Sequence, residues 1–159
     1  MNKKLIAIMI TLVVLILIGV TIILTYNSKE KFYLENSYYN KGGLKDITTK
    51  EIDKLIKDKK SFVLFTYNDF CSFSVPCDSV FEEASNKLNI TILQIPYRDF
   101  KKTVLNKKIK YGPSVIIVKN GKVVKFLDAE KDDDKILYQD VKKFNAWLSK
   151  YIYTEKEKK

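Results

Sequence analysis

The longest hydrophobic feature of the chain is the stretch from Leu5 to Leu24, which is uncharged and almost wholly apolar. A helix needs about 20 apolar residues to cross a bilayer, so this stretch predicts a membrane-spanning helix. A cleaved signal peptide, the alternative, would have a shorter apolar core and a small-residue cleavage site, whereas this stretch continues into Thr25-Tyr26-Asn27. We therefore predict a retained signal anchor over residues 1–26.

The charges around this stretch bear on its orientation. Lys3 and Lys4 precede it, and further lysines follow it, so the charge bias does not decide the orientation by itself. A short basic head before the first span usually stays in the cytoplasm, which places the following residues outside, where disulfides persist. We expect a single-pass protein of the cell membrane with an extracytoplasmic C-terminal domain.

Residues 27–46 carry no sustained helical or strand period. They are polar and aromatic, with a break at Gly42-Gly43, which is typical of a linker. We predict a domain over residues 47–153, followed by a charged tail over residues 154–159.

Short apolar runs alternate with amphipathic segments through this domain. Thr48 or Thr49 can cap a first helix, and Ser61–Tyr67 is apolar on both faces, as in a central strand of a covered sheet. Residues at helical spacing predict a second helix: Cys77, Val80, Phe81, Ala84 and Leu88. A strand over Ile90–Ile95 follows it.

The C-terminal half continues the alternation. A lysine-rich amphipathic segment over Phe100–Tyr111 should turn Val104, Leu105 and Ile109 inward. Two strands then meet at Asn120-Gly121, the preferred pair for a type I′ hairpin. Apolar positions mark a closing helix that begins in an acidic run: Ile136, Leu137, Val141, Phe144, Leu148 and Ile152.

Composition narrows the function classes. The net charge is +10, from 29 basic and 19 acidic residues, but Arg98 is the only arginine. Scattered lysine does not favour nucleic-acid recognition and is more typical of solubility or of mild attraction to an anionic envelope surface. The absence of histidine excludes a histidine-based catalytic triad, and two cysteines alone make a poor metal site, so we expect no metal.

Both cysteines of the chain, Cys71 and Cys77, lie between an apolar strand and an amphipathic helix. A thiol at a helix N-terminus faces unpaired N–H groups and the positive end of the helix dipole, which favour the thiolate. This placement indicates redox chemistry. The alternative is that both cysteines are small hydrophobic residues of the core.

The order of elements, together with two motifs, resembles the thioredoxin superfamily over residues 47–152. Phe70-Cys71 corresponds to the family's aromatic residue and attacking cysteine, and Gly112-Pro113-Ser114 before the Asn120-Gly121 turn resembles its cis-proline strand. The resemblance implies an α/β thioredoxin fold, a central mixed β-sheet flanked by helices. It also implies a cis Pro113 that faces the active thiol, in a groove where Phe70, Ser74, Gly112 and Pro113 bind an extended substrate. The alternative for Gly112-Pro113 is a simple turn before a strand.

The spacing of the cysteines departs from the family, because five residues separate Cys71 from Cys77 instead of two. In a gapless alignment Ser74 replaces the resolving cysteine and Cys77 lies on a core-facing turn, roughly 9 Å from Cys71 if the residues between are helical. In an alignment with an expanded loop, Pro76-Cys77 matches the proline and resolving cysteine of the family. Proline is tolerated in the first turn of a helix, so this helix should begin near Ser74, a good N-cap. We favour a reversible Cys71–Cys77 disulfide.

A second departure concerns proton transfer. The family often buries an acidic residue six positions before the attacking cysteine, near a lysine on the next strand. Phe65 and Gln94 occupy these places here. Fast dithiol reduction of the ordinary kind is therefore not expected.

Two functions remain open at this stage. The first is a membrane-anchored thiol-disulfide oxidoreductase in which Cys71 and Cys77 are catalytic, which needs no bound cofactor and acts on protein thiols or disulfides. A further partner would reset its redox state. The second is a non-catalytic module that binds an extended peptide in the cis-proline groove.

Overall fold

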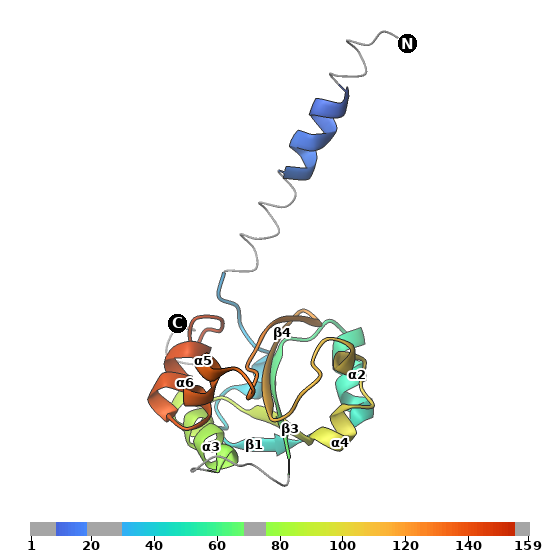
Figure 1. Ribbon diagram of the computed structural model, residues 1–159. Coiled ribbons are helices and arrows are strands. Elements are labelled where there is room, and N and C mark those ends of the chain that lie inside the picture. Colours follow the sequence, from blue (N-terminus) through green and yellow to red (C-terminus); the bar gives the residue numbers. More distant parts are fainter. Residues whose placement is uncertain (1–8, 19–29, 69–75, 155–159) are drawn as a thin grey trace. The chain divides into compact units, whose positions relative to one another are not determined.

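A single five-stranded sheet organises the described part of the chain (Figure 1). The computed structural model describes residues 9–18, 30–68 and 76–154. The strands are β1 (Leu44–Asp46), β2 (Phe62–Tyr67), β3 (Ile92–Pro96), β4 (Ser114–Lys119) and β5 (Lys122–Phe126). Their order is β1-β3-β2-β4-β5; β1, β3 and β2 are parallel, whereas β4 is antiparallel to β2 and β5. This is the mixed sheet that the family resemblance implies.

Helices cover both faces of the sheet. The longer ones are α2 (Thr49–Lys57), α3 (Cys77–Leu88) and α6 (Val141–Leu148), and the shorter ones are α4 (Tyr97–Phe100), α5 (Asp132–Lys135), η1 (Asn36–Tyr38), η2 (Val104–Lys107) and η3 (Ile136–Tyr138). Figure 1 shows α3 and α6 on one side of the sheet and α2 and α4 on the other.

Alternating side chains of the central strands divide the core into two layers. Val63 and Phe65 of β2 point toward α3 and α6, whereas Phe62 and Leu64 pack with Ile52 of α2. Both faces of β2 are covered by helices. Its sequence is therefore a continuous apolar run, as is usual for a buried central strand. The double-sided strand predicted from the sequence is confirmed.

Local signals set several element boundaries. The Thr48 side chain accepts from the Glu51 N–H, and the Glu51 carboxylate accepts from the Thr48 N–H, which forms the capping box of α2. Asn120 and Gly121 both have positive φ, as the predicted type I′ turn requires. The capped first helix and the hairpin are therefore confirmed.

Two segments differ from the predicted pattern. In the lysine-rich segment Leu105 and Ile109 are buried as expected, but Val104 is 50% exposed, so its inward placement was wrong. The closing helix is also interrupted between η3 and α6, because the Asp140 carboxylate accepts from the Lys143 N–H at 3.0 Å and starts a new helix.

Residues 31–46 are not the linker that their lack of periodicity suggested. β1 pairs in register with β3, and the contacts divide the chain into the units Met1–Glu30 and Lys31–Lys159. The Phe32 N–H donates to the Tyr151 carbonyl, and the Tyr153 N–H donates to the Phe32 carbonyl, both at 3.0 Å.

Buried aromatic side chains, without a periodic pattern, hold this segment against the domain. Tyr39 is buried, and its hydroxyl donates to the Tyr153 carbonyl at 2.8 Å and accepts from the Leu34 N–H at 3.1 Å. Single buried side chains with irregular backbone between them leave no period in the sequence, which is why the boundary near residue 45 was placed too late.

In the N-terminal unit, a helix covers residues 9–18. Within the described ranges, no helix is both long enough and apolar enough to cross a membrane. The rest of the predicted span, residues 5–8 and 19–24, lies outside those ranges.

We predict that Phe81→Ala destabilises the domain by about 3–5 kcal/mol, the usual cost of removing a buried phenyl ring. The Phe81 ring lies 4.7 Å from the rings of Phe65 and Phe144 and 5.5 Å from that of Tyr138, centroid to centroid, so one truncation opens a cavity among three aromatic residues. Urea unfolding followed by the fluorescence of the only tryptophan, Trp147, measures the effect. The matched control is Glu82→Ala, on the exposed face of α3, which should change stability by less than about 0.5 kcal/mol. Equal effects of the two variants would contradict the assignment of Phe81 to the core.

Candidate functional site

Cys77 is the first residue of α3 and lies at the edge of the core layer beneath that helix. It is 2% exposed and belongs to the same buried cluster as Val80 and Phe81. It is also disulfide-bonded. Three other predicted site residues, Phe70, Cys71 and Ser74, lie outside the described residues.

The start of α3 differs from the prediction. Pro76 is its N-cap, not Ser74, and no side chain in the described part of the chain caps this end. Proline fits here because its missing N–H needs no partner at the start of a helix. Cys77 is therefore the first residue of α3, and its sulfur is close in sequence to the unpaired N–H groups at the positive end of the helix dipole.

The Gly112–Pro113 loop lies beside the end of the strand that leads toward Cys71. Ser114, the first residue of β4, is in antiparallel register with Thr66 of β2. The Ser114 N–H donates to Thr66 Oγ1 at 3.0 Å, and Thr66 Oγ1 donates to the Ser114 carbonyl at 3.4 Å. The buried threonine thus fixes the loop against β2, two residues before Asn68.

The Gly112–Pro113 peptide bond is cis, as the sequence led us to expect. Pro113 itself is buried, and Gly112 is half-buried. Gly112 also has a steric requirement, because a Cβ at this position would lie 2.6 Å from the Tyr97 ring. The ring of Tyr97 covers one side of the loop at the place where only glycine fits.

Two further side chains hold the loop by its carbonyl groups. Asn68 Nδ2 donates to the Gly112 carbonyl at 2.7 Å, and the Tyr138 hydroxyl donates to the Pro113 carbonyl at 3.0 Å. Burial, reinforced by the carboxylates of Asp134 and Asp128, raises the pKa of Tyr138 far above its usual value. Tyr138 therefore stays a protonated donor at any physiological pH.

Phe65 and Gln94, the residues at the places where the family often has an acid and a lysine, lie side by side in the sheet. Phe65 is 1% exposed and is in register with Gln94 on β3, the neighbouring place named from the sequence. Gln94 Nε2 donates to Asp46 Oδ1 at 3.0 Å, which directs its amide toward β1. At the position where the family often has a carboxylate, this chain has Phe65, whose ring packs against Phe81.

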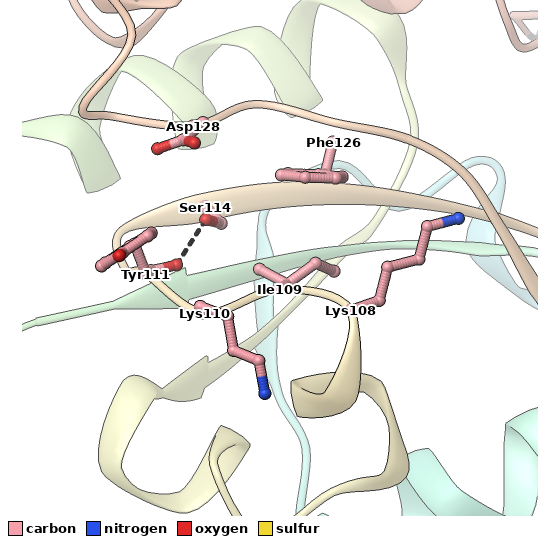
Figure 2. Close-up of a pocket in the computed structure, with 7 residues that line it drawn as sticks. All are labelled: Lys108, Ile109, Lys110, Tyr111, Ser114, Phe126 and Asp128. Carbon is pink, nitrogen blue, oxygen red and sulfur yellow. Dashed lines mark hydrogen bonds between the residues drawn. The ribbon is translucent and has the colours of Figure 1, made fainter.

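A small hollow of about 120 Å³ adjoins the loop. Figure 2 shows the residues that line it, with Tyr111 and Ser114 joined by a hydrogen bond and Asp128 above them. The lining residues are Lys108, Ile109, Lys110, Tyr111, Ser114, Phe126 and Asp128. The hollow is too small for a cofactor of ordinary size but could take one side chain of a bound polypeptide.

The sequence did not identify Asn68, Tyr97 or Tyr138 as parts of this site. Each is a polar or aromatic residue near the end of an element, which is a common pattern with no specific meaning. Only the folded chain brings them to one loop, from β2, α4 and η3.

Comparisons with known proteins place this geometry in context. The sequence model of the family described as Thioredoxin matches residues 43–143. No curated protein matches the chain.

Solved structures that are similar include three thioredoxins. A thioredoxin mutant from Entamoeba histolytica is 22% identical, with 63% of this chain and 98% of that one covered and a TM-score of 0.47. The oxidised thioredoxin from Plasmodium falciparum is 18% identical, with 64% and 98% covered and a TM-score of 0.47. Thioredoxin O1 from Arabidopsis thaliana, in its oxidised state, is 16% identical, with 69% and 98% covered and a TM-score of 0.47.

We predict that Tyr138→Phe lowers the free energy of unfolding by about 1–3 kcal/mol, because it leaves the buried Pro113 carbonyl without its donor. Urea unfolding measures the change. Tyr111→Phe is the matched control, since that side chain is 54% exposed, and it should stay within about 0.5 kcal/mol of the wild type. A Tyr138→Phe variant as stable as the control would show that this hydrogen bond does not hold the loop.

Proposed function

Because the chain belongs to the thioredoxin family, we propose that it is a membrane-anchored, extracytoplasmic thiol-disulfide oxidoreductase that acts on envelope proteins. The observation that carries the proposal is the disulfide-bonded Cys77 at the N-terminus of α3. The family's fold suggests thiol-disulfide chemistry, and a sulfur at this helix end has the environment that such chemistry uses.

The proposed partner of Cys77 is Cys71, since the chain has two cysteines. Of the two alignments, the one with the expanded loop gains support from the start of α3 at Cys77, directly after Pro76, whose backbone is not helical. A continuous helix from Cys71 to Cys77 would hold the sulfurs too far apart for a bond.

In the reducing direction, the Cys71 thiolate attacks one sulfur of a substrate disulfide and releases the other sulfur as a thiolate. Cys77, deprotonated, then attacks Cys71 in this mixed disulfide. The Cys71–Cys77 disulfide forms, and the second substrate sulfur leaves as a thiolate. The substrate gains two electrons, and a dithiol partner protein must return two electrons to the cysteine pair. Run backwards, the same steps oxidise a substrate dithiol.

The surroundings of the pair favour a slow resolving step. Phe65 offers no carboxylate to accept a proton from Cys77, so ionisation of this thiol depends on the N-terminus of α3. The proposed substrate groove lies along Gly112 and Pro113. Phe70 and Ser74, its other predicted members, lie outside the described residues.

The proposed anchor is the apolar stretch from Leu5 to Leu24, whose basic head would stay in the cytoplasm. That orientation would place residues 31–159 in an oxidising space. A disulfide-bonded Cys77 fits such a compartment.

A non-catalytic peptide-binding module is the second candidate function. The observation in its favour is Phe65, which replaces the acid of the ordinary reductase with a core aromatic residue. In this case the disulfide would be structural, and the groove would hold a partner without turnover.

We predict that the protein reduces insulin in the presence of dithiothreitol and that Cys71→Ser abolishes this activity, because no nucleophile is left to attack the disulfide. Cys77→Ser, reduced beforehand and then freed of dithiothreitol, should instead accumulate a mixed disulfide between Cys71 and insulin, visible by mass spectrometry. Ser79→Ala, an exposed serine in the first turn of α3, is the control for local change and should retain the wild-type rate. Wild-type activity no higher than that of the cysteine variants would favour the binding module.

Alkylation before and after reduction tests the bond itself. Protein taken from membranes should show two blocked thiols only after reduction. Two thiols that react before reduction would rule out a Cys71–Cys77 disulfide in the cell.

A further prediction concerns the anchor. Protease treatment of intact cells should remove the domain and leave a small membrane-bound fragment, because residues 31–159 lie outside in the proposed orientation. Immunoblotting with antibodies to the domain measures the loss, and a cytoplasmic protein serves as the control for cell integrity. Full protection of the domain in intact cells, with digestion after lysis, would reverse the orientation.

A further inference from the structure

The loop from Lys110 to Ser114 has all its carbonyl groups occupied by side chains of the same chain. The donors, in order along the loop, are the hydroxyl of Tyr97, the hydroxyl of Ser114 (2.7 Å), the amide of Asn68 (2.7 Å), the hydroxyl of Tyr138 (3.0 Å) and the hydroxyl of Thr66 (3.4 Å). By contrast, the N–H groups of Tyr111 and Gly112 have no acceptor among the described residues. The loop therefore offers two unpaired donors, whereas each of its carbonyl oxygens already accepts one hydrogen bond.

This distribution matters for the docking of an extended polypeptide. A peptide that adds to a strand edge exchanges hydrogen bonds in both directions, so it needs an acceptor as well as a donor. Beside the proposed thiol site the half-buried Gly112 supplies the donor, while its carbonyl already accepts from Asn68. Pro113 cannot replace it, because its carbonyl accepts from the fully buried Tyr138.

The side chains that hold the loop differ in how easily they can move. Thr66 and Tyr138 are 0% exposed and are locked by the core around them. Asn68 is half-buried and follows the last residue of β2, and within the described ranges its side chain bonds to Gly112 only. Of the donors on Gly112, Pro113 and Ser114, Asn68 is the one that can leave without disturbing the core.

We propose that Asn68 determines substrate specificity by covering the Gly112 carbonyl, so that an extended polypeptide docks only by displacing the Asn68 amide. This role rests on the proposed oxidoreductase function. Docking of a polypeptide then costs one hydrogen bond that a small disulfide, which does not pair with the loop, need not break. Asn68 thereby weakens binding of unfolded chains in general relative to small disulfides.

The test compares a polypeptide disulfide with a small one, using the full-length protein in detergent. KM and kcat are measured for insulin and for hydroxyethyl disulfide, with dithiothreitol as reductant. In the Asn68→Ala variant we expect the ratio of the KM for insulin to the KM for hydroxyethyl disulfide to fall about fivefold, the effect of one ordinary hydrogen bond. The matched control is Asn106→Ala, whose half-buried side chain lies in η2 and makes none of the hydrogen bonds to the loop; its ratio should equal that of the wild type.

The outcomes separate this inference from the proposed function. A wild-type protein that reduces both disulfides, with an unchanged or increased KM ratio in Asn68→Ala, overturns the role of Asn68 and leaves the oxidoreductase function standing. A wild-type protein that reduces neither overturns the function and the role of Asn68 together. If Asn68→Ala does not fold, as judged by circular dichroism, Asn68→Asp takes its place with the same expectation, because an ionised carboxylate of the same size cannot donate to the carbonyl.

Discussion

The antiparallel register of β2 with β4 is the constraint on which the rest of the site depends. It sets Thr66 opposite Ser114, and the threonine hydroxyl joins both backbone groups of that serine. Because the pairing is fixed at this row, the Gly112–Pro113 loop must lie beside the end of β2, whose chain continues into the cysteine stretch. A slip of one residue would turn the apolar positions of β2 to the wrong core layers, so the packing that stabilises the domain also positions the loop.

The position of Phe65 is subject to two different requirements, since the core needs an apolar side chain there and the proposed chemistry would gain from an acid. A buried carboxylate there would assist proton transfer, but it would also carry the cost of burying a charged group next to Phe81. This chain has the aromatic residue, which packs in the layer that also contains Phe144 and Tyr138. The aromatic residue therefore adds to the packing of the core, and it is compatible with slow exchange or with binding alone.

In the loop, donors from α4, β4, η3 and β2, together with Asn68, satisfy successive carbonyl groups. Tyr138 is buried and Tyr97 packs on Gly112, so the core and a neighbouring ring both hold the loop. Asn68 is only half-buried, unlike Tyr138, and donates to the Gly112 carbonyl. Recognition would then be governed less by the flexibility of the loop than by the one hydrogen bond that can be exchanged.

The sequence by itself determined the order of the main elements from α2 to α6, the double-sided β2 strand, the capped α2 helix and the Asn120-Gly121 turn, because each depends on local periodicity or on a residue with a specific backbone preference. It also identified Gly112-Pro113 and the neighbouring places of Phe65 and Gln94 through the family resemblance. Only the tertiary structure decided that Phe32, Leu34 and Tyr39 belong to the core, that α3 begins after Pro76, and that Asn68 and Tyr138 meet the loop. These features rest on contacts between residues far apart in the chain, and irregular backbone or a single polar side chain leaves no pattern in the sequence from which such contacts could be foreseen.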